Sequence, residues 1–266
     1  MGHRLRATKP RRPRPPKPHP GTPKWPSYRG HSQRVGASPG GRVTVYVDPG
    51  LGASGLKNAQ DLVADADRIV RANDALFGVP GGDTSVIIFA LGGVTDGTGG
   101  ADHNGCDFVT GAAIEVCASF GNSGRVSALF EAELSECSMG GNLCGVSTGE
   151  ALSRKCAQLV GHGALNDFTT APSWFRGGMK NWVDQTEGSD VKAQSTGCAV
   201  AFISWLKGQG HDLNQIAPAM VRLGDTGTLA KLYEALTGDA SSNAWPKFKA
   251  AVRNLPGGVV NDDPFG

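Results

Sequence analysis

The sequence lacks several features that would assign a protein class at once. No stretch approaches the roughly 18 uninterrupted apolar residues of a membrane-spanning helix, so we expect no membrane span. The first residues contain no apolar core, so no signal peptide is visible, and the export signal of a secreted form would have been removed or would lie elsewhere. C-x-x-C, G-x-S-x-G, a Walker loop and a dinucleotide fingerprint are also missing. These absences count against a zinc ribbon, a nucleophile-elbow hydrolase and the common nucleotide sites.

Acidic residues are absent from the first 42 positions. This segment holds eleven Lys and Arg and nine Pro, whereas residues 43–266 hold fifteen basic and twenty-four acidic side chains. The overall net charge of +2 therefore hides a segment of +11 and a body of −9. Because residues 1–42 have almost nothing to bury, the composition predicts a disordered, Pro-rich arm.

The charge of the arm suggests which partners it would attract. Nucleic acid, another polyanion, an anionic membrane surface or the acidic body of a second copy would all suit it, and the last of these would give a homo-oligomer. A solubilising linker or a mis-assigned start explains the same composition. The candidate partner-binding residues in the arm are Arg11, Arg12, Arg14 and Lys17.

The body contains six cysteines, an even number. Their count and clustering favour disulfides, and hence an oxidising, extracellular or cell-surface location. Among the possible pairings, Cys106 with Cys117 is the one we expect, because the two flank a short Gly-containing segment. The six are Cys106, Cys117, Cys137, Cys144, Cys156 and Cys198.

The order of apolar patterns predicts an α+β domain over residues 43–253, followed by a C-terminal tail over 254–266. Strands are expected at Val43–Val47, within Ser85–Leu91 and around Ala112–Cys117, with a helix over Leu56–Phe77. With 39% hydrophobic residues in 266, the chain can bury one good core. Helical patterns then follow over residues 123–138, 148–161, 195–208, 213–222, 227–236 and 242–253.

Two short acidic motifs lie close together between Phe130 and Arg154. Residues 132–136 read A-E-L-S-E, and residues 149–154 read G-E-A-L-S-R at the start of the next helix. The first resembles the H-E-x-x-H helix of gluzincins with Ala and Glu in place of both histidines, and the second resembles their distal Glu. The pair is also similar to uncharacterised bacterial secreted proteins that carry A-E-x-x-E and G-E-x-L-S-R elements.

The C-terminal half adds to this resemblance. Residues 195–206 resemble the late helix of gluzincin-like families such as the plant basic secretory proteins. Together, the resemblance implies a zincin-like (peptidase-MA-like) domain over residues 43–253, with a small mixed sheet and helices first and a helical C-terminal half. It places Glu133 where a gluzincin has its general base, which makes Glu133 the candidate catalytic residue.

Helical geometry gives independent weight to Glu133. On a helix, Val126, Phe130 and Cys137 point in one direction, and Glu133 falls within that apolar stripe. A carboxylate there needs a raised pKa, a partner or a polar cavity. Glu136 lies one turn on and could share a ligand or proton with it. A structural salt bridge to Arg125, Arg154 or another base explains the pair equally well, and Glu131 is expected to point to solvent.

Glu150 has a structural explanation of its own. Ser147-Thr148-Gly149-Glu150 has the pattern of a capping box, and Arg154 stands four residues later at ion-pair spacing. Either contact would account for Glu150 without metal chemistry.

The candidate metal ligands are Glu136, Glu150 and His103. His103 stands within the Gly-rich stretch of residues 99–106, at the entrance to the expected edge strand, where a solvated loop histidine is the common outcome. No two histidines have ligand spacing. An all-oxygen site would suit Ca²⁺, Mg²⁺ or Mn²⁺ better than Zn²⁺, so we expect no zinc cofactor and leave a divalent metal open.

Trp174 and Phe175 are the remaining candidates for partner binding. They stand in a Pro- and Gly-flanked segment, where two large aromatic rings could stack on a sugar or seat a partner. Packing between helices explains them as well.

The sequence thus favours a secreted, non-catalytic binding or self-assembling protein on a zincin-like, pseudo-peptidase scaffold. The alternative is a metal-dependent hydrolase or peptidase that uses Glu133 as general base with a non-standard metal.

Overall fold

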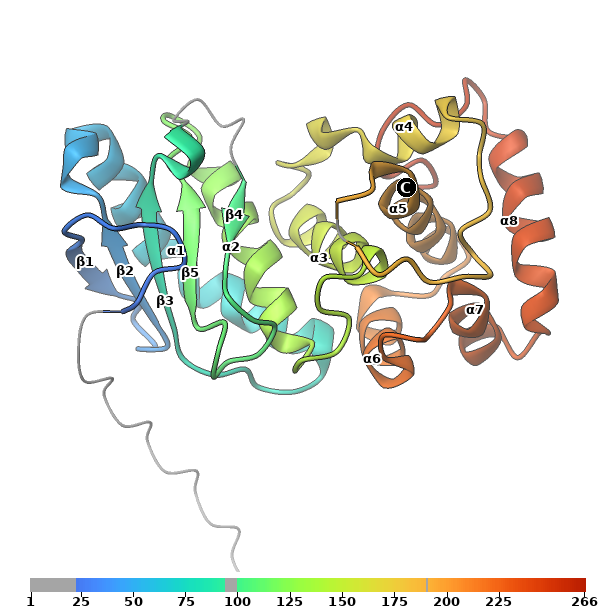
Figure 1. Cartoon of the computed structure of the whole chain (residues 1–266), viewed down its shortest axis with the longest axis horizontal. Coiled ribbons are helices and arrows are strands. Elements are labelled where there is room, and N and C mark those ends of the chain that lie inside the picture. The colour runs from blue at the N-terminus through green and yellow to red at the C-terminus, as the bar shows by residue number, and fades with distance from the viewer. Residues whose placement is uncertain (1–22, 94–99, 190) are drawn as a thin grey trace, which may run out of the picture.

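The computed structural model describes residues 23–93, 100–189 and 191–266. Figure 1 shows two halves side by side, a sheet with its helices on the left and a group of helices on the right. None of the helices in these described ranges is long and apolar enough to cross a membrane. The α+β class expected from the sequence is confirmed.

A five-stranded sheet organises the first half, in the order β1-β2-β3-β5-β4. The three central strands run parallel, and each edge strand is antiparallel to its neighbour. The short strand β4 therefore forms one edge, beside β5. The strands are β1 Gln33–Ala37, β2 Val43–Val47, β3 Thr84–Phe89, β4 Ala101–Asp102 and β5 Ala113–Cys117.

Two helices pack against one face of the sheet, α1 (Gly52–Phe77) against β2 and β3 and α2 (Ser123–Ser138) against β5. Alternate strand residues such as Val45, Ile88 and Val116 point into this interface and are buried, as the two-residue period of a strand requires. Helix α3 (Ser147–Val160) packs on the other side of α2 and connects it to the helical half.

The helical half is built around α5, whose residues from Ser195 to Leu206 are all buried. A helix that is apolar around its whole circumference belongs in the interior, and here α3, α4, α7 and α8 surround it. The remaining helices are α4 Thr170–Arg176, α5 Ala193–Gly208, α6 Leu213–Leu223, α7 Leu229–Thr237 and α8 Ala244–Arg253, with short 3₁₀ turns at Pro49–Leu51, Leu91–Gly93, Asn166–Phe168 and Ser241–Asn243.

The second face of the sheet is covered by a segment that the sequence assigned to the arm. Trp25 is buried against Ile87 and Phe89. The fully buried Glu115 of β5 accepts hydrogen bonds from the backbone N–H groups of Ser27 and Tyr28, at 2.8 and 2.6 Å. The prediction of a disordered arm is therefore wrong for residues 23–42, because β1 and these contacts fold them onto the sheet. The other arm residues lie outside the described ranges.

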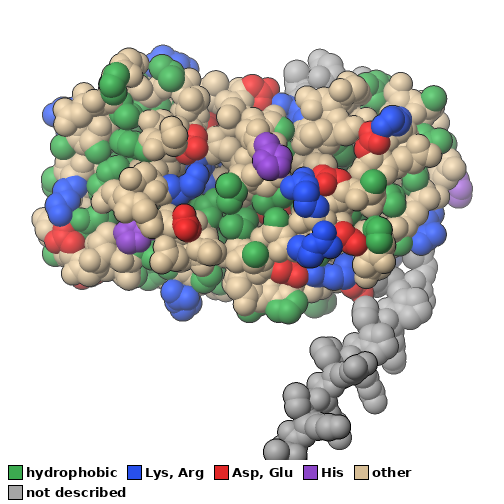
Figure 2. All heavy atoms as spheres, turned by 180° about the vertical axis from the view of Figure 1, so that it is seen from behind, with side chains coloured by type: hydrophobic (Ala, Val, Ile, Leu, Met, Phe, Trp, Pro, Cys, Tyr) green, Lys and Arg blue, Asp and Glu red, His purple; other side chains and the backbone are tan. Residues whose placement is uncertain are grey.

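Acidic and basic side chains are interspersed over the surface. Figure 2 shows one face of the molecule, on which Lys and Arg side chains lie beside Asp and Glu. This face thus presents no large area of one sign among the described residues.

Burial of α2 corrects one expectation directly. Glu131 was expected to point to solvent, but its side chain is fully buried and neither carboxylate oxygen has a hydrogen-bond partner. Because α2 is enclosed by α1, the sheet and α3, even the side opposite the apolar stripe is in the interior. Burial, partly offset by the charge of Arg68 and reinforced by Asp74, raises the pKa of Glu131 well above its usual range.

Replacing this carboxylate should make stability less sensitive to pH. A raised folded-state pKa favours folding fully below the unfolded value, near 4.5, and the contribution is lost as pH rises through the folded value. We therefore expect Glu131→Gln to gain stability relative to the wild type as pH rises from about 4.5 to 8, as measured by urea denaturation at several pH values. The matched control is Glu234→Gln on exposed α7 surface. A wild-type advantage that grows with pH would contradict the assignment.

Candidate functional site

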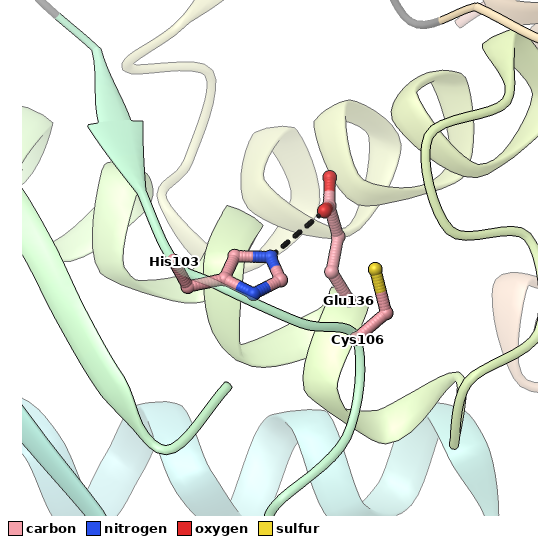
Figure 3. Close-up of side chains that lie close together, drawn as sticks. All are labelled: His103, Cys106 and Glu136. Atoms are coloured by element: carbon pink, nitrogen blue, oxygen red, sulfur yellow. Dashed lines mark hydrogen bonds and ion pairs between the residues drawn. The ribbon is translucent and has the colours of Figure 1, made fainter. Parts of the chain in front are cut away.

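A compact acid–histidine cluster forms between the end of β4 and the C-terminal part of α2; it consists of His103, Glu133 and Glu136. His103 Nε2 lies 2.9 Å from Glu136 Oε2 and 3.4 Å from Glu133 Oε2. The side chain of His103 is 5% exposed, against 14% for Glu133 and 18% for Glu136. Figure 3 shows His103 reaching toward Glu136 across the gap between strand and helix.

Covalent and backbone contacts hold His103 in this position. Asp102, the last residue of β4, pairs with Glu115 of β5, so His103 leaves the sheet at its edge. The segment that follows is tied to the turn after α2 by the Cys106–Cys144 disulfide and by a 2.6 Å hydrogen bond from the Gly141 N–H to the Cys106 carbonyl. The segment that carries His103 is therefore fixed on one side by the sheet and on the other by the turn after α2.

One glycine makes the close packing of this loop feasible. A Cβ atom at Gly111 would lie 1.8 Å from the Gly105 carbonyl oxygen and 2.9 Å from His103 Nδ1. Any side chain there would displace the carbonyl to which His103 is bonded. Only glycine therefore fits at position 111, because the Gly105 carbonyl and the His103 ring pack directly against its Cα atom.

The hydrogen bonds of His103 determine its protonation. The Nδ1–H donates to the Gly105 carbonyl, which can only accept, so Nε2 carries either a lone pair or a second proton. A lone pair facing two carboxylates would be repelled. A proton on Nε2 that is donated to Glu136 removes this repulsion and makes the pair an imidazolium beside a carboxylate.

The pKa shifts follow this geometry. Burial alone would lower the pKa of His103, but the hydrogen bond and charge of Glu136 outweigh burial and raise it above 6.5. Burial, followed by the charges of Glu136, Glu150 and Asp102, raises the pKa of Glu133 well above its usual range. The cluster therefore favours a charged His103 and a neutral Glu133.

Glu150 stands close enough for its charge to act on Glu133, but its direct contact is with Arg154, whose Nε lies 2.6 Å from Glu150 Oε1. The expected i,i+4 ion pair is confirmed. The capping box is wrong: α3 begins after Val146 without a side-chain cap, and the Ser147 N–H donates to the Glu187 carbonyl instead. Tertiary packing of residue 187 against the helix start replaces the local cap.

Of the acid and histidine residues singled out in the sequence, His103, Glu133 and Glu136 therefore lie together, and Glu150 acts on Glu133 through its charge. Neither Arg125 nor Arg154 pairs with Glu133 or Glu136, because Arg125 bonds Asp167 and Arg154 bonds Glu150. The base that the sequence left unnamed is His103.

The donor set does not fit a zinc ion. In the described part of the chain, one group of three residues has ligand atoms within 4.8 Å of one another: His103, Cys106 and Glu136. The Cys106 sulfur is bonded to Cys144 and offers no thiolate, which leaves one nitrogen, from His103, and the carboxylate oxygens of Glu136 and the nearby Glu133. Catalytic zinc sites use three protein ligands, mostly nitrogen or sulfur.

Two further expectations are corrected. Cys106 pairs with Cys144 and not with Cys117, because the fold brings the loop after β4 to the turn after α2 while Cys117 is buried inside β5. Trp174 is fully buried and stacks on Phe248, so it cannot seat a partner, and Phe175 beside it is half-buried. Arg11, Arg12, Arg14 and Lys17 lie outside the described residues.

The cluster can be tested by titrating His103. We expect Glu136→Gln to lower the His103 pKa, because it removes the charge that stabilises the imidazolium. Since the raised pKa of His103 stabilises the fold below its unfolded value and this contribution is lost as pH rises through the folded one, the wild-type advantage over Glu136→Gln should shrink toward alkaline pH. Histidine NMR titration and thermal unfolding measure both effects. Glu234→Gln serves as control; an unchanged His103 titration in Glu136→Gln would refute the pairing.

Comparison with known proteins gives a partial structural likeness. No protein-family model matches the sequence, and no curated protein matches it. Two solved structures of an M1 zinc metallopeptidase from Deinococcus radiodurans, the enzyme and a point mutant, are similar at 13% and 12% identity, each with a TM-score of 0.46. They cover 80% and 77% of this chain, which spans about half of theirs, 49% and 48%. This likeness assigns no function to the chain.

Proposed function

We propose that this chain is a secreted binding protein on a zincin-like scaffold and that it does not hydrolyse peptides. The observation that carries the proposal is the direct contact of His103 Nε2 with Glu136, at 2.9 Å. This is hydrogen-bond distance, so the two groups neutralise each other without an ion between them. The Cys106–Cys144 disulfide supports an oxidising compartment.

The state of Glu133 argues in the same direction. A general base must accept a proton from water, which requires an ionised carboxylate. Burial and three neighbouring acids raise the pKa of Glu133 and favour its protonated form. Ala132 also stands where a gluzincin has its first zinc-binding histidine, so neither metal nor base is provided as peptide hydrolysis requires.

Metal analysis of the purified chain tests this proposal. We expect no stoichiometric Zn²⁺, Mn²⁺ or Ca²⁺ after dialysis against each metal, because His103 is engaged by Glu136. We also expect no metal-dependent cleavage of a casein or peptide-library substrate. Stoichiometric metal that is lost in Glu136→Ala and kept in Glu234→Ala would overturn the metal-free cluster, and metal-dependent cleavage with the same pattern would establish the metallohydrolase alternative.

The basic N-terminal residues are proposed to promote self-association or polyanion binding. Support comes from their charge, since residues 1–22 hold seven Lys and Arg and no acid. Trp25 and Ser27 pack against the sheet, so a deletion that leaves the fold intact has to end before them.

Deletion of residues 1–22 should abolish binding to heparin or reduce the sedimentation coefficient, with thermal stability unchanged. A full-length variant with Arg11, Arg12, Arg14 and Lys17 changed to Gln separates charge from length. Unchanged sedimentation and unchanged heparin retention in both proteins would reduce the segment to a linker.

A further inference from the structure

A cavity of about 630 Å³ opens between α3, α4 and α5. We propose that it binds a small organic anion, with the oxyanion held by Arg176, Thr196 and the start of α5. This inference rests on the proposed binding function and names the class of ligand.

The cavity carries a net positive charge from its arginines. Arg154 and Arg176 both line it, and Glu150 is its one acidic wall residue. Arg154 is neutralised by Glu150 at 2.6 Å and also donates to the Thr170 hydroxyl. Arg176, the last residue of α4, is exposed and forms no ion pair within the described ranges. The remaining charge of about +1 selects an anion of single charge, because an unpaired guanidinium binds an oxyanion through parallel N–H groups.

Helix α5 aims its positive end at the same space. It is a 16-residue helix that begins after Lys192 with no side-chain cap, and its first residue, Ala193, lines the cavity. The first N–H groups of a helix have no partner inside the helix, and its dipole favours negative charge at this end. The Glu187 carboxylate also lies at this helix start, but its hydrogen bond and ion pair are with the side chains of Ser195 and Lys192, at 3.2 and 2.9 Å, so an anion in the cavity would use the first backbone N–H groups.

Thr196, on the same side of the cavity, has a hydroxyl group with an unused hydrogen-bonding capacity. It is 1% exposed and lines the cavity, and its Oγ1 is buried with no hydrogen-bond partner. A buried hydroxyl is normally bonded, and an orphaned one calls for an explanation. Rotation of the side chain toward the cavity wall would let this hydroxyl donate to an oxygen of a bound anion.

The volume of the cavity indicates the size of the ligand, and its apolar wall indicates an apolar part. Phe168 lines the cavity, and the Arg154 guanidinium lies over its ring at 5.1 Å, which holds the ring in place. The volume exceeds that of a simple ion and falls in the range of pockets for small organic molecules. A carboxylic acid with an aromatic or aliphatic body satisfies both walls.

Isothermal titration of the full chain with N-acetylphenylalanine tests the proposal, and the amide of the same compound controls for shape. We expect saturable binding of the acid, and binding of the amide weaker by about tenfold or more, since a charged hydrogen bond is lost. Arg176→Gln and Thr196→Val should each weaken binding of the acid. Arg253→Gln, an exposed arginine in the last turn of α8, should leave it unchanged.

The outcomes separate cleanly. No saturable binding of the acid, equal binding of acid and amide, or equal losses in Arg176→Gln and Arg253→Gln would each overturn the anion site. Because none of these substitutions touches His103 or Glu136, failure here leaves the metal analysis of the cluster unaffected. A peptide ending in phenylalanine, compared with the free acid, then distinguishes a peptide C-terminus from a small acid as the natural source.

Discussion

Burial of helix α2 is the constraint on which the site depends. The helix is enclosed by the sheet, α1 and α3 and still carries three carboxylates. Each of them must gain a partner or a proton, because an isolated charge in the interior is costly. Glu136 gains His103, Glu133 shifts toward its neutral form, and Glu131 has no hydrogen bond at all. The edge position of β4, the nearby disulfide and Gly111 all serve to bring one histidine to this helix.

The acid–histidine cluster and the cavity lined by α3, α4 and α5 differ in exposure and in charge balance. The cluster is largely closed and self-neutralised, whereas the cavity has unsatisfied donors and a surplus of positive charge. Glu150 joins the two, since its charge acts on Glu133 and its carboxylate pairs with Arg154. The charge of an anion bound in the cavity would therefore act on Arg154 and Glu150 in the cavity and on Glu133 in the cluster. Under the proposed function, the cavity recognises the ligand while His103 and Glu136 stay paired.

Much of the fold was accessible from periodicity. The helix over residues 123–138 and the strand over Val43–Val47 occur as predicted, because long apolar patterns report burial directly. The two-residue strand β4 was missed, and so were strand β1 and helix α4. β1 lies in a segment whose overall composition resembles an arm, and α4 is only seven residues long. Neither leaves a periodic signal strong enough to oppose its surroundings.

For the site, the sequence alone determined which residues were chemically unusual: Glu133 within an apolar stripe, Glu136 one turn on and His103 beside an edge strand. Only the tertiary structure decided how they are used. It paired His103 with Glu136, joined Cys106 to Cys144 and brought α4 and α5 together around a cavity whose lining residues span positions 150–196. Local patterns indicate which side chains lie in an apolar stripe, although they missed the burial of Glu131 on the opposite side of α2. They cannot report its partner, because contacts between residues far apart in the chain depend on how whole elements pack.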